Sequence, residues 1–213
     1  MTDALTLATH DDVDIDTAEP GWDEVARMRG RGFDRRRAEA AVVELLAAVG
    51  HGTDDPNLAD TPRRVAAAYR ELLERKPLRL TTFPNDEGYD ALVLVRDIPF
   101  TSLCAHHLLP FRGVAHVGYV PGDRLLGLSK LARIVEHFAR DLQLQERLTV
   151  QIADCLETEL APGGVGVVLE AEHLCMSVRG VQAAGARTHT SRFTGALAPS
   201  GGEHFASSAS SRG

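Results

Sequence analysis

Two cysteine–histidine pairs are the residues of this sequence best suited to chemistry. Cys104 and His107 stand three apart in the run Cys-Ala-His-His, so one loop can present a thiolate and an imidazole to one ion. His173 and Cys175 stand two apart in an expected strand, which would turn both side chains to one side. Two thiolates and one imidazole, from Cys104, His107 and Cys175, leave Zn²⁺ a fourth position for water, as catalytic zinc sites do.

A closed structural zinc site is the alternative that these positions leave open. His106 or His173 would then be the fourth ligand, and no water would remain on the ion. Three of the other histidines, His51, His116 and His137, are expected to be surface or packing residues. A catalytic zinc brings the pKa of its water to roughly 7, so hydroxide becomes available at neutral pH.

Cations and a carboxylate on two expected helices indicate a nucleotide ligand. Lys130 and Arg133 stand three apart near a helix start, so they share a face beside backbone N–H groups that favour phosphate. Glu146, next to Gln145, can accept hydrogen bonds from N1–H and the exocyclic amine of guanine, which adenine cannot supply. Each of these features by itself is also typical of a solvated helix face.

Apolar residues at helical spacing predict four helices that position these groups. Asp60 or Thr61 can cap the second helix, with Pro62 in its first turn. Ser129 can cap the third, and Cys155 lies in the apolar stripe of the fourth, where we expect it to be packed. The expected helices are 35–49 with an apolar face of Ala38, Val42, Leu45, Leu46 and Val49, then 60–73, 129–138 and 144–160.

Three strands and an α+β fold are expected between and after these helices. Apolar runs predict strands over 91–100, 113–120 and 166–175. The turn at Pro121-Gly122 ends the second of these strands. Strands grouped with pairs of helices are typical of α+β proteins.

The composition is that of a soluble globular protein. Hydrophobic residues make up 44% and charged residues 25% of the 213 residues. No run approaches the roughly 18 to 20 apolar residues of a membrane helix, and no signal pattern opens the chain. Three cysteines do not make a disulfide scaffold, and they are better suited to metal binding or burial in a reducing compartment. We therefore expect a cytoplasmic protein without a membrane partner.

The charge is concentrated at the N-terminus. Six acidic residues and no Lys or Arg lie in the first 20 positions, and the rest of the chain is near neutral although the whole carries −7. This balance argues against nucleic-acid binding by bulk electrostatics. We expect an acidic leader over 1–30, a catalytic domain over 31–195 and a Ser/Gly-rich tail over 196–213.

Several segments together resemble the signature of the GTP cyclohydrolase I family. They are CAHHLLPF at 104–111, AHVGYVP at 115–121, GLSKLARIV at 127–135, QLQERLT at 143–149 and EHLCM at 172–176. The likeness covers roughly residues 35–195 and rests on the joint match. It implies conversion of GTP to 7,8-dihydroneopterin triphosphate with release of formate, the first step of a pterin/folate or deazapurine pathway.

The resemblance implies a role for each matching position. Cys104, His107 and Cys175 match the zinc ligands. His106 matches the general acid–base near N7 of the purine, His173 a second histidine beside the reacting ring, and Ser129 a residue near the ribose. Two residues, Glu146 and Gln145, match positions that bind guanine. Positions that bind the triphosphate, some of them across subunit boundaries, are matched by Lys130, Arg133, Arg179 and Arg64.

The resemblance also implies the tunnelling fold (T-fold), with an antiparallel sheet, paired helices and N-terminal helices. Its subunits close into a barrel, commonly a homodecamer with active sites between subunits. Ala105 departs from the family pattern because family members usually carry Glu there. The segment 187–192 follows the family pattern only partly, and a Ser/Gly tail replaces the usual acidic C-terminal extension. Together these departures suggest a paralogue in a specialised pathway. Two alternatives are a catalytically silent GTP- or pterin-binding paralogue and an enzyme that stops at the formamide intermediate.

Overall fold

A computed structural model describes residues 32–198 and residue 205 of the chain. The chain divides into the units Met1–Asp34 and Arg35–Gly213, and every helix and strand named below belongs to the second. The acidic leader expected over 1–30 lies outside the described residues, as do positions 199–204 and 206–213 of the expected tail.

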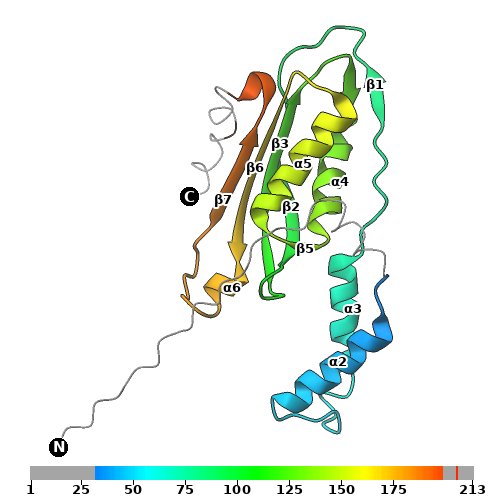
Figure 1. The fold of residues 1–213 in the computed structure, drawn as a ribbon, viewed down its shortest axis with the longest axis vertical. Coiled ribbons are helices and arrows are strands. Elements are labelled where there is room, and N and C mark those ends of the chain that lie inside the picture. The colour runs from blue at the N-terminus through cyan, green and yellow to red at the C-terminus, as the bar shows by residue number, and fades with distance from the viewer. Residues whose placement is uncertain (1–31, 199–204, 206–213) are drawn as a thin grey trace, which may run out of the picture. The chain divides into compact units, whose positions relative to one another are not determined.

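A five-stranded sheet organises the second unit (Figure 1). The strand order is β5-β2-β3-β6-β7; β5 is parallel to β2, and the other neighbouring pairs are antiparallel. A separate two-stranded sheet pairs β1 with β4. The strands are β1 Thr82–Pro84, β2 Val93–Cys104, β3 Pro110–Val120, β4 Arg124–Leu126, β5 Leu142–Gln143, β6 Gly164–His173 and β7 Thr188–Phe193.

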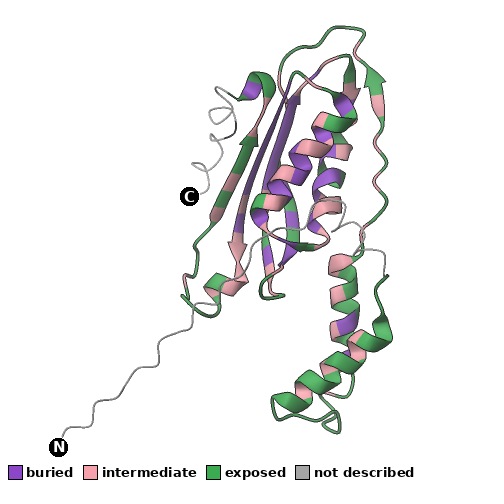
Figure 2. Ribbon diagram, in the orientation of Figure 1, coloured by how far each residue is buried: buried purple, intermediate pink, exposed green. Residues whose placement is uncertain are grey.

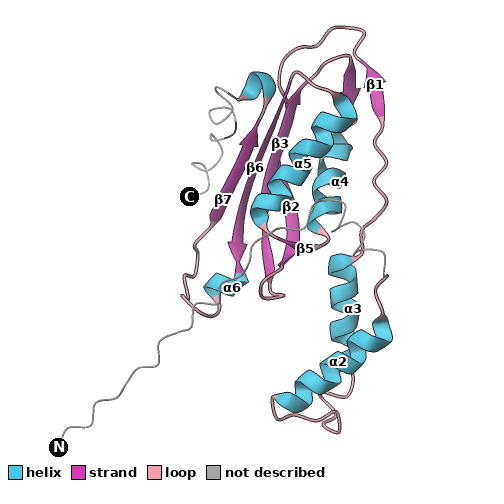
Figure 3. Cartoon of the chain, viewed as in Figure 1, coloured by secondary structure: helices cyan, strands magenta, loops and turns pink. Residues whose placement is uncertain are grey.

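Two helices, α4 and α5, lie along one face of this sheet, while α2 and α3 precede it in the chain (Figure 3). The α+β prediction is confirmed. The helices are α2 Arg35–Ala48, α3 Thr61–Leu73, α4 Leu128–Ala139, α5 Gln145–Leu160, the single turn α6 Leu174–Ser177 and the 3₁₀ turn η1 Gly195–Leu197. Among the described residues, none of these helices is long and apolar enough to cross a membrane.

The core lies between the sheet and the pair α4 and α5, where Figure 2 shows the buried residues concentrated. Alternate residues of β3 and β6 face the helices because strand side chains alternate in direction. Burying one large aliphatic or aromatic side chain contributes about 1.5–3 kcal/mol. Fully buried examples are Phe111, Val117, Tyr119, Val167 and Leu169 from the strands and Leu131, Ile134, Leu148, Ile152 and Leu156 from the helices.

Cys155 packs against this core, as its place in the apolar stripe predicts. Burial raises the pKa of its thiol to about 11. The thiol is therefore protonated at neutral pH and suited to packing rather than to metal binding.

Three details of the elements differ from the sequence predictions. The last predicted strand ends at His173, and Cys175 lies in α6, so the two do not share a strand face. Ser129 is inside α4, whose N-cap is Gly127. Asp60 occupies the N-cap of α3 without a side-chain cap, because its carboxylate pairs instead with Arg63 and Arg64.

Helix α2 forms where the sequence predicts it, but its apolar face stays largely open within this chain. Leu45 and Val49 are each 61% exposed, and no residue of α2 is buried. Apolar spacing can indicate which residues share a helix face. Which surface covers that face depends on tertiary and quaternary contacts.

Candidate metal centre and active site

Cys104, His107 and Cys175 come together at one end of the sheet, with ligand atoms all within 4.8 Å of one another. The Cys104 and Cys175 Sγ atoms are 4.0 Å apart, and Cys104 Sγ is 3.7 Å from His107 Nδ1. Tetrahedral zinc with usual bond lengths would separate two sulfurs by roughly 3.8 Å, and a sulfur and a nitrogen by roughly 3.6 Å. Two of the three donor distances are therefore close to those of a zinc site, and the donor set fits a zinc ion.

A tight loop after β2 presents the first two ligands. Cys104 closes the strand, and its carbonyl accepts the N–H of Leu108 at 2.9 Å, so the chain folds back at once. Leu108 has a φ of 55°, a left-handed conformation that is costly for a residue other than glycine. The Tyr69 hydroxyl on α3 donates to the Leu108 carbonyl at 3.0 Å and holds this conformation.

The third ligand arrives through the turn of helix α6. The chain leaves β6 at His173 and curls, with the Val178 N–H donating to Leu174 O at 3.1 Å. This turn brings Cys175 beside Cys104, whereas a continued strand would have carried it past. Burial, and then the neighbouring Cys104, raise the pKa of the Cys175 thiol. A bound dication would reverse this by stabilising both thiolates.

Two expected site residues flank His107, one of the candidate metal ligands. Arg179 Nη1 lies 3.4 Å from His107 Nε2, the ring nitrogen turned away from Cys104 Sγ. The ring of His106 lies edge-on to that of His107, with centroids 6.1 Å apart. Both His106 and Arg179 are exposed, so a ligand above the metal centre can reach them.

His173 lies beside the centre in an ordered aromatic and polar setting. Its ring stacks on Phe111 with centroids 4.5 Å apart and planes 3° from parallel. Its Nε2 is 2.8 Å from Oε1 of Gln145, a side chain that is only 1% exposed. Burial lowers the pKa of His173, and the charge of Glu146 acts in the opposite direction. Glu146 is itself exposed in the first turn of α5.

The residues expected near the ribose and triphosphate divide between the two ends of the sheet. Phe111 pairs with His173 at the metal end, and Tyr119 pairs with Val165 at the other, roughly 26 Å away at about 3.3 Å per residue. The Leu126 N–H donates to the Tyr119 hydroxyl at 2.8 Å, which places the start of α4 at the far end. Ser129 and Lys130 lie in the first turn of α4 there, with Arg133 one turn further along.

Arg64 belongs to the metal end. It precedes Tyr69 on α3 by roughly 7.5 Å along the helix axis. Its guanidinium is exposed and lies 3.5 Å from the Asp60 carboxylate. Within one chain the structure thus brings Cys104, His107, Cys175, His106, His173, Gln145, Glu146, Arg179 and Arg64 to one end, and leaves Ser129, Lys130 and Arg133 along α4.

Sequence reasoning missed three residues that organise the site. Tyr69 lies in the predicted helix 60–73, and nothing in the local sequence indicates what its hydroxyl contacts. Phe111 stands in the motif that carries the metal ligands, yet nothing in its spacing indicates stacking on His173. Thr190, on the edge strand β7, lies 3.1 Å from Gln145 Nε2, a contact between residues 45 positions apart.

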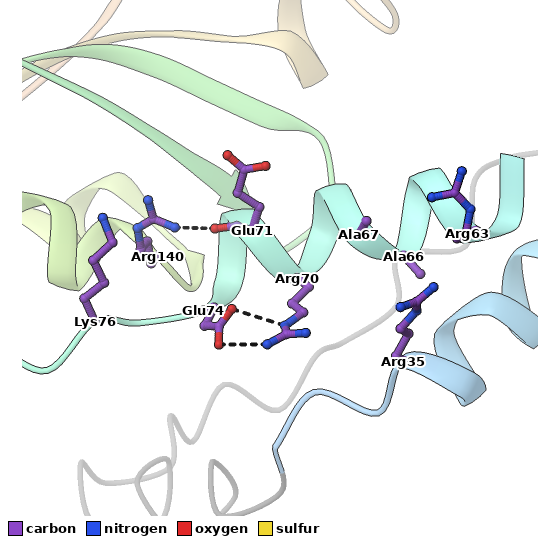
Figure 4. A pocket seen from close by; sticks show the side chains of 9 residues that line it. All are labelled: Arg35, Arg63, Ala66, Ala67, Arg70, Glu71, Glu74, Lys76 and Arg140. Carbon is purple, nitrogen blue, oxygen red and sulfur yellow. Dashed lines mark hydrogen bonds and ion pairs between the residues drawn. The ribbon is translucent and has the colours of Figure 1, made fainter. Parts of the chain in front are cut away.

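A separate cavity of ≈ 460 Å³ beside α3 is lined by none of the metal ligands (Figure 4). Its charged groups are engaged with one another: Arg70 pairs with Glu74 at 3.2 Å, and Arg140 donates to the Glu71 carbonyl. This pairing makes the cavity a weaker anion site than its number of cations suggests. Its lining is Arg35, Arg63, Ala66, Ala67, Arg70, Glu71, Glu74, Lys76 and Arg140.

The fold and the donor set together define an α+β protein whose sheet ends in a site suited to a metal ion. A family model described as GTP cyclohydrolase I matches residues 38–207. Proteins named GTP cyclohydrolase 1 are similar over most of the chain. The one from Mycobacteroides abscessus is 56% identical over 171 residues, covering 78% of this chain and 84% of its own.

Two further relatives carry the same name. The protein from Streptomyces griseus is 54% identical over 78% of this chain and 85% of its own length. The protein from Mycobacterium avium is 54% identical over 81% of this chain and 87% of its own length. The chain belongs to the GTP cyclohydrolase I family, and its sheet with paired helices is the T-fold of that family.

Proposed function

We propose that this chain catalyses the zinc-dependent hydrolysis and rearrangement of GTP to 7,8-dihydroneopterin triphosphate with release of formate. The observation that carries the proposal is the cluster of Cys104, His107 and Cys175, with ligand atoms within 4.8 Å of one another, beside an exposed His106. Family membership and relatives named GTP cyclohydrolase 1 support the substrate. The reaction consumes one water in sum, and C8 of the purine leaves as formate.

Each residue near the centre has a defined task in this proposal. Bound Zn²⁺ would supply Lewis acidity and an activated water at neutral pH. His106 transfers a proton at N7, because a histidine can give or take one near neutral pH. Glu146 accepts two hydrogen bonds from guanine, and Arg179 and Arg64 hold phosphate oxygens so that C8 lies over the metal.

Neopterin fluorescence after oxidation of the reaction mixture tests this activity directly. Purified protein with measured zinc content should convert GTP to the fluorescent product, and absence of fluorescence at full zinc occupancy would refute the proposal. His106→Ala should lose product and keep zinc, while His51→Ala, an exposed histidine on the α2–α3 connection, should keep both. Loss of zinc in His106→Ala would mean that His106 and His107 have exchanged roles.

We propose a homo-oligomer with shared sites, a decameric barrel, and the positions of the expected phosphate residues support shared sites. Ser129, Lys130 and Arg133 lie along α4, whose start is at the end of the sheet opposite the metal ligands. The α4 N-terminus has no side-chain cap, so its N–H groups and Lys130 are suited to phosphate. We propose that they complete the site of a neighbouring copy, with no nucleic acid or membrane involved.

Mixing two inactive variants tests the shared site. One variant is Lys130→Ala/Arg133→Ala and the other is His106→Ala, and each disables one end of the chain. In a random 1:1 mixture about a quarter of the sites would combine the two intact ends, so about a quarter of the sites should be restored. Recovered activity supports a site made from two copies, and no recovery from verified mixed oligomers contradicts it. Light scattering on the same samples reports whether the assembly is a decamer.

Ala105 bears on the pathway that uses the product. Its N–H donates to Gln143 O at 3.0 Å, and it brings no carboxylate to the edge of the metal centre. We propose a specialised role in a pterin or deazapurine pathway. We also propose that the protein is cytoplasmic, because a reducing compartment keeps cysteine ligands as thiolates. Full rescue of a strain lacking its own cyclohydrolase would remove the reason for a special role. Consumption of GTP with neither formate release nor a pterin chromophore would mark an enzyme that stops at the formamide, because C8 is still held there as the formyl group.

A further inference from the structure

Gln145 makes a complete set of hydrogen bonds inside the chain, and these bonds determine how its amide is oriented. Its Nε2 lies 2.9 Å from Thr188 O and 3.3 Å from Leu169 O, two carbonyls that can only accept. The reverse orientation would press Oε1 against both carbonyl oxygens. The amide nitrogen therefore faces the strands, and Oε1 must face His173.

A chain of hydroxyls fixes the same orientation independently. Thr149 donates to the backbone carbonyl of Gln145 at 2.9 Å, which uses its only hydroxyl hydrogen. At 2.7 Å, Thr190 must then be the donor to Thr149. Thr190 Oγ1 is thereby left to accept from Gln145 Nε2 at 3.1 Å. The donors run in one direction through α5 and β7. The two hydrogens of Gln145 Nε2 are shared among Thr188 O, Thr190 Oγ1 and Leu169 O, all of which accept.

The proton position on His173 follows from this network. Oε1 of Gln145 can only accept, so Nε2 of His173, 2.8 Å away, must carry a hydrogen. Stacking on Phe111, with ring planes 3° apart, limits rotation of the imidazole. A neutral ring with hydrogen on Nε2 has its lone pair on Nδ1, which becomes the acceptor that this histidine offers.

We propose that Gln145 is a positioning residue that holds His173 as the Nε2–H tautomer, with Nδ1 as the acceptor for the ligand. The consequence of this fixed tautomer for catalysis rests on the proposed function. With its side chain 1% exposed and both amide ends engaged, Gln145 acts on the substrate through His173 rather than as a direct guanine contact. A fixed tautomer matters because a ring with hydrogen on the wrong nitrogen cannot accept there.

Solid-state ¹⁵N NMR of zinc-loaded protein with labelled histidine measures the tautomer directly, and the His173→Gln variant assigns the signal. Wild-type His173 should show hydrogen on Nε2 and a bare Nδ1. Gln145→Met, which keeps the length but removes both polar ends, should give a mixture of tautomers. Hydrogen on Nδ1 in the wild type would overturn the proposal, whether or not the variant folds.

Gln151→Met is the matched control. Gln151 lies on the same helix, is 6% exposed and bonds to Gln143 rather than to His173. It should keep the wild-type tautomer, and an unchanged tautomer in Gln145→Met as well would refute the positioning role.

Kinetics separate this role from guanine binding and from the proposed function itself. Gln145→Met should lower kcat by about 10²-fold with KM for GTP within a factor of two, as expected when a catalytic group loses its geometry. A raised KM with unchanged kcat would instead indicate a direct contact and overturn the proposal. If wild-type protein makes no pterin, the proposed function fails, whereas the NMR result still decides the tautomer.

Discussion

Replacing Tyr69 by phenylalanine tests how the metal-binding loop is held. The change removes one atom, the hydroxyl that donates to Leu108 O at 3.0 Å. Leu108 has a φ of 55°, and a left-handed conformation costs a non-glycine residue roughly 1–2 kcal/mol. A neutral hydrogen bond contributes about 0.5–1.5 kcal/mol net, so it offsets much of that cost.

The expected result is a weaker but still present zinc site. Losing about 1 kcal/mol from the loop that carries Cys104 and His107 should raise the zinc dissociation constant about fivefold, since 1.4 kcal/mol is tenfold. Competition against a chromophoric chelator measures this constant. Tyr89→Phe is the control, because Tyr89 is 49% exposed and lies in the loop between β1 and β2.

Two outcomes would refute this reasoning. Zinc affinity equal to that of wild type would mean that the loop keeps its conformation without Tyr69. Complete loss of zinc from a folded protein would mean that Tyr69 does far more than hold one carbonyl. Leu108→Gly distinguishes the two contributions, because glycine adopts a positive φ without strain and should recover part of the affinity in the Tyr69→Phe background.

Three further predictions follow from other parts of the molecule. Cys175→Ala should lower the zinc content measured by atomic absorption to near zero, while Cys155→Ala, whose thiol has a pKa of about 11, should keep full content; equal zinc in both would disprove the assignment. Burial lowers the pKa of His116, so the unfolded state binds more protons, and the free energy of unfolding should decline as pH falls through the unfolded pKa of about 6.5. His116→Asn, which keeps an acceptor for the Asp97 N–H, should flatten that decline in denaturant titrations at several pH values; an identical slope would exclude His116 as its source. Phe205→Ala should lower the free energy of unfolding by about 3 kcal/mol because its ring is 3% exposed and packs on Phe193, whereas Phe33→Ala, at 39% exposed, should change it by about 0.5 kcal/mol or less; similar values would mean that residue 205 contributes little.

Local patterns predicted most of the elements because periodicity records which side of a segment is buried. The four main helices start within two residues of the predicted positions, and the core residues Leu131, Ile134 and Leu148 lie in the predicted helices 129–138 and 144–160. Strand ends were less accurate. Strand β2 continues to Cys104 through a bulge at Asp97, a feature decided by pairing with β3 rather than by the local sequence.

The three candidate metal ligands lie close together, as the sequence prediction requires, but the expected reason for it was partly wrong. The residue types identified Cys104, His107 and Cys175, and the structure places them together. The expected strand face shared by His173 and Cys175 does not exist, because the chain turns into α6 between them. Donor chemistry is a property of side chains, whereas the path that brings them together is a property of the fold.

The sequence by itself determined the α+β class and the family and indicated the candidate donor set, because these depend on residue types and their spacing. Only the tertiary structure decided that Cys175 reaches Cys104 through a helical turn and that Tyr69 holds the loop of His107. It also decided that Gln145 faces His173 and that Lys130 lies at the far end of the sheet. These relations join residues far apart in the chain, and local spacing carries no information about contacts that form only when the strands pair and the helices pack.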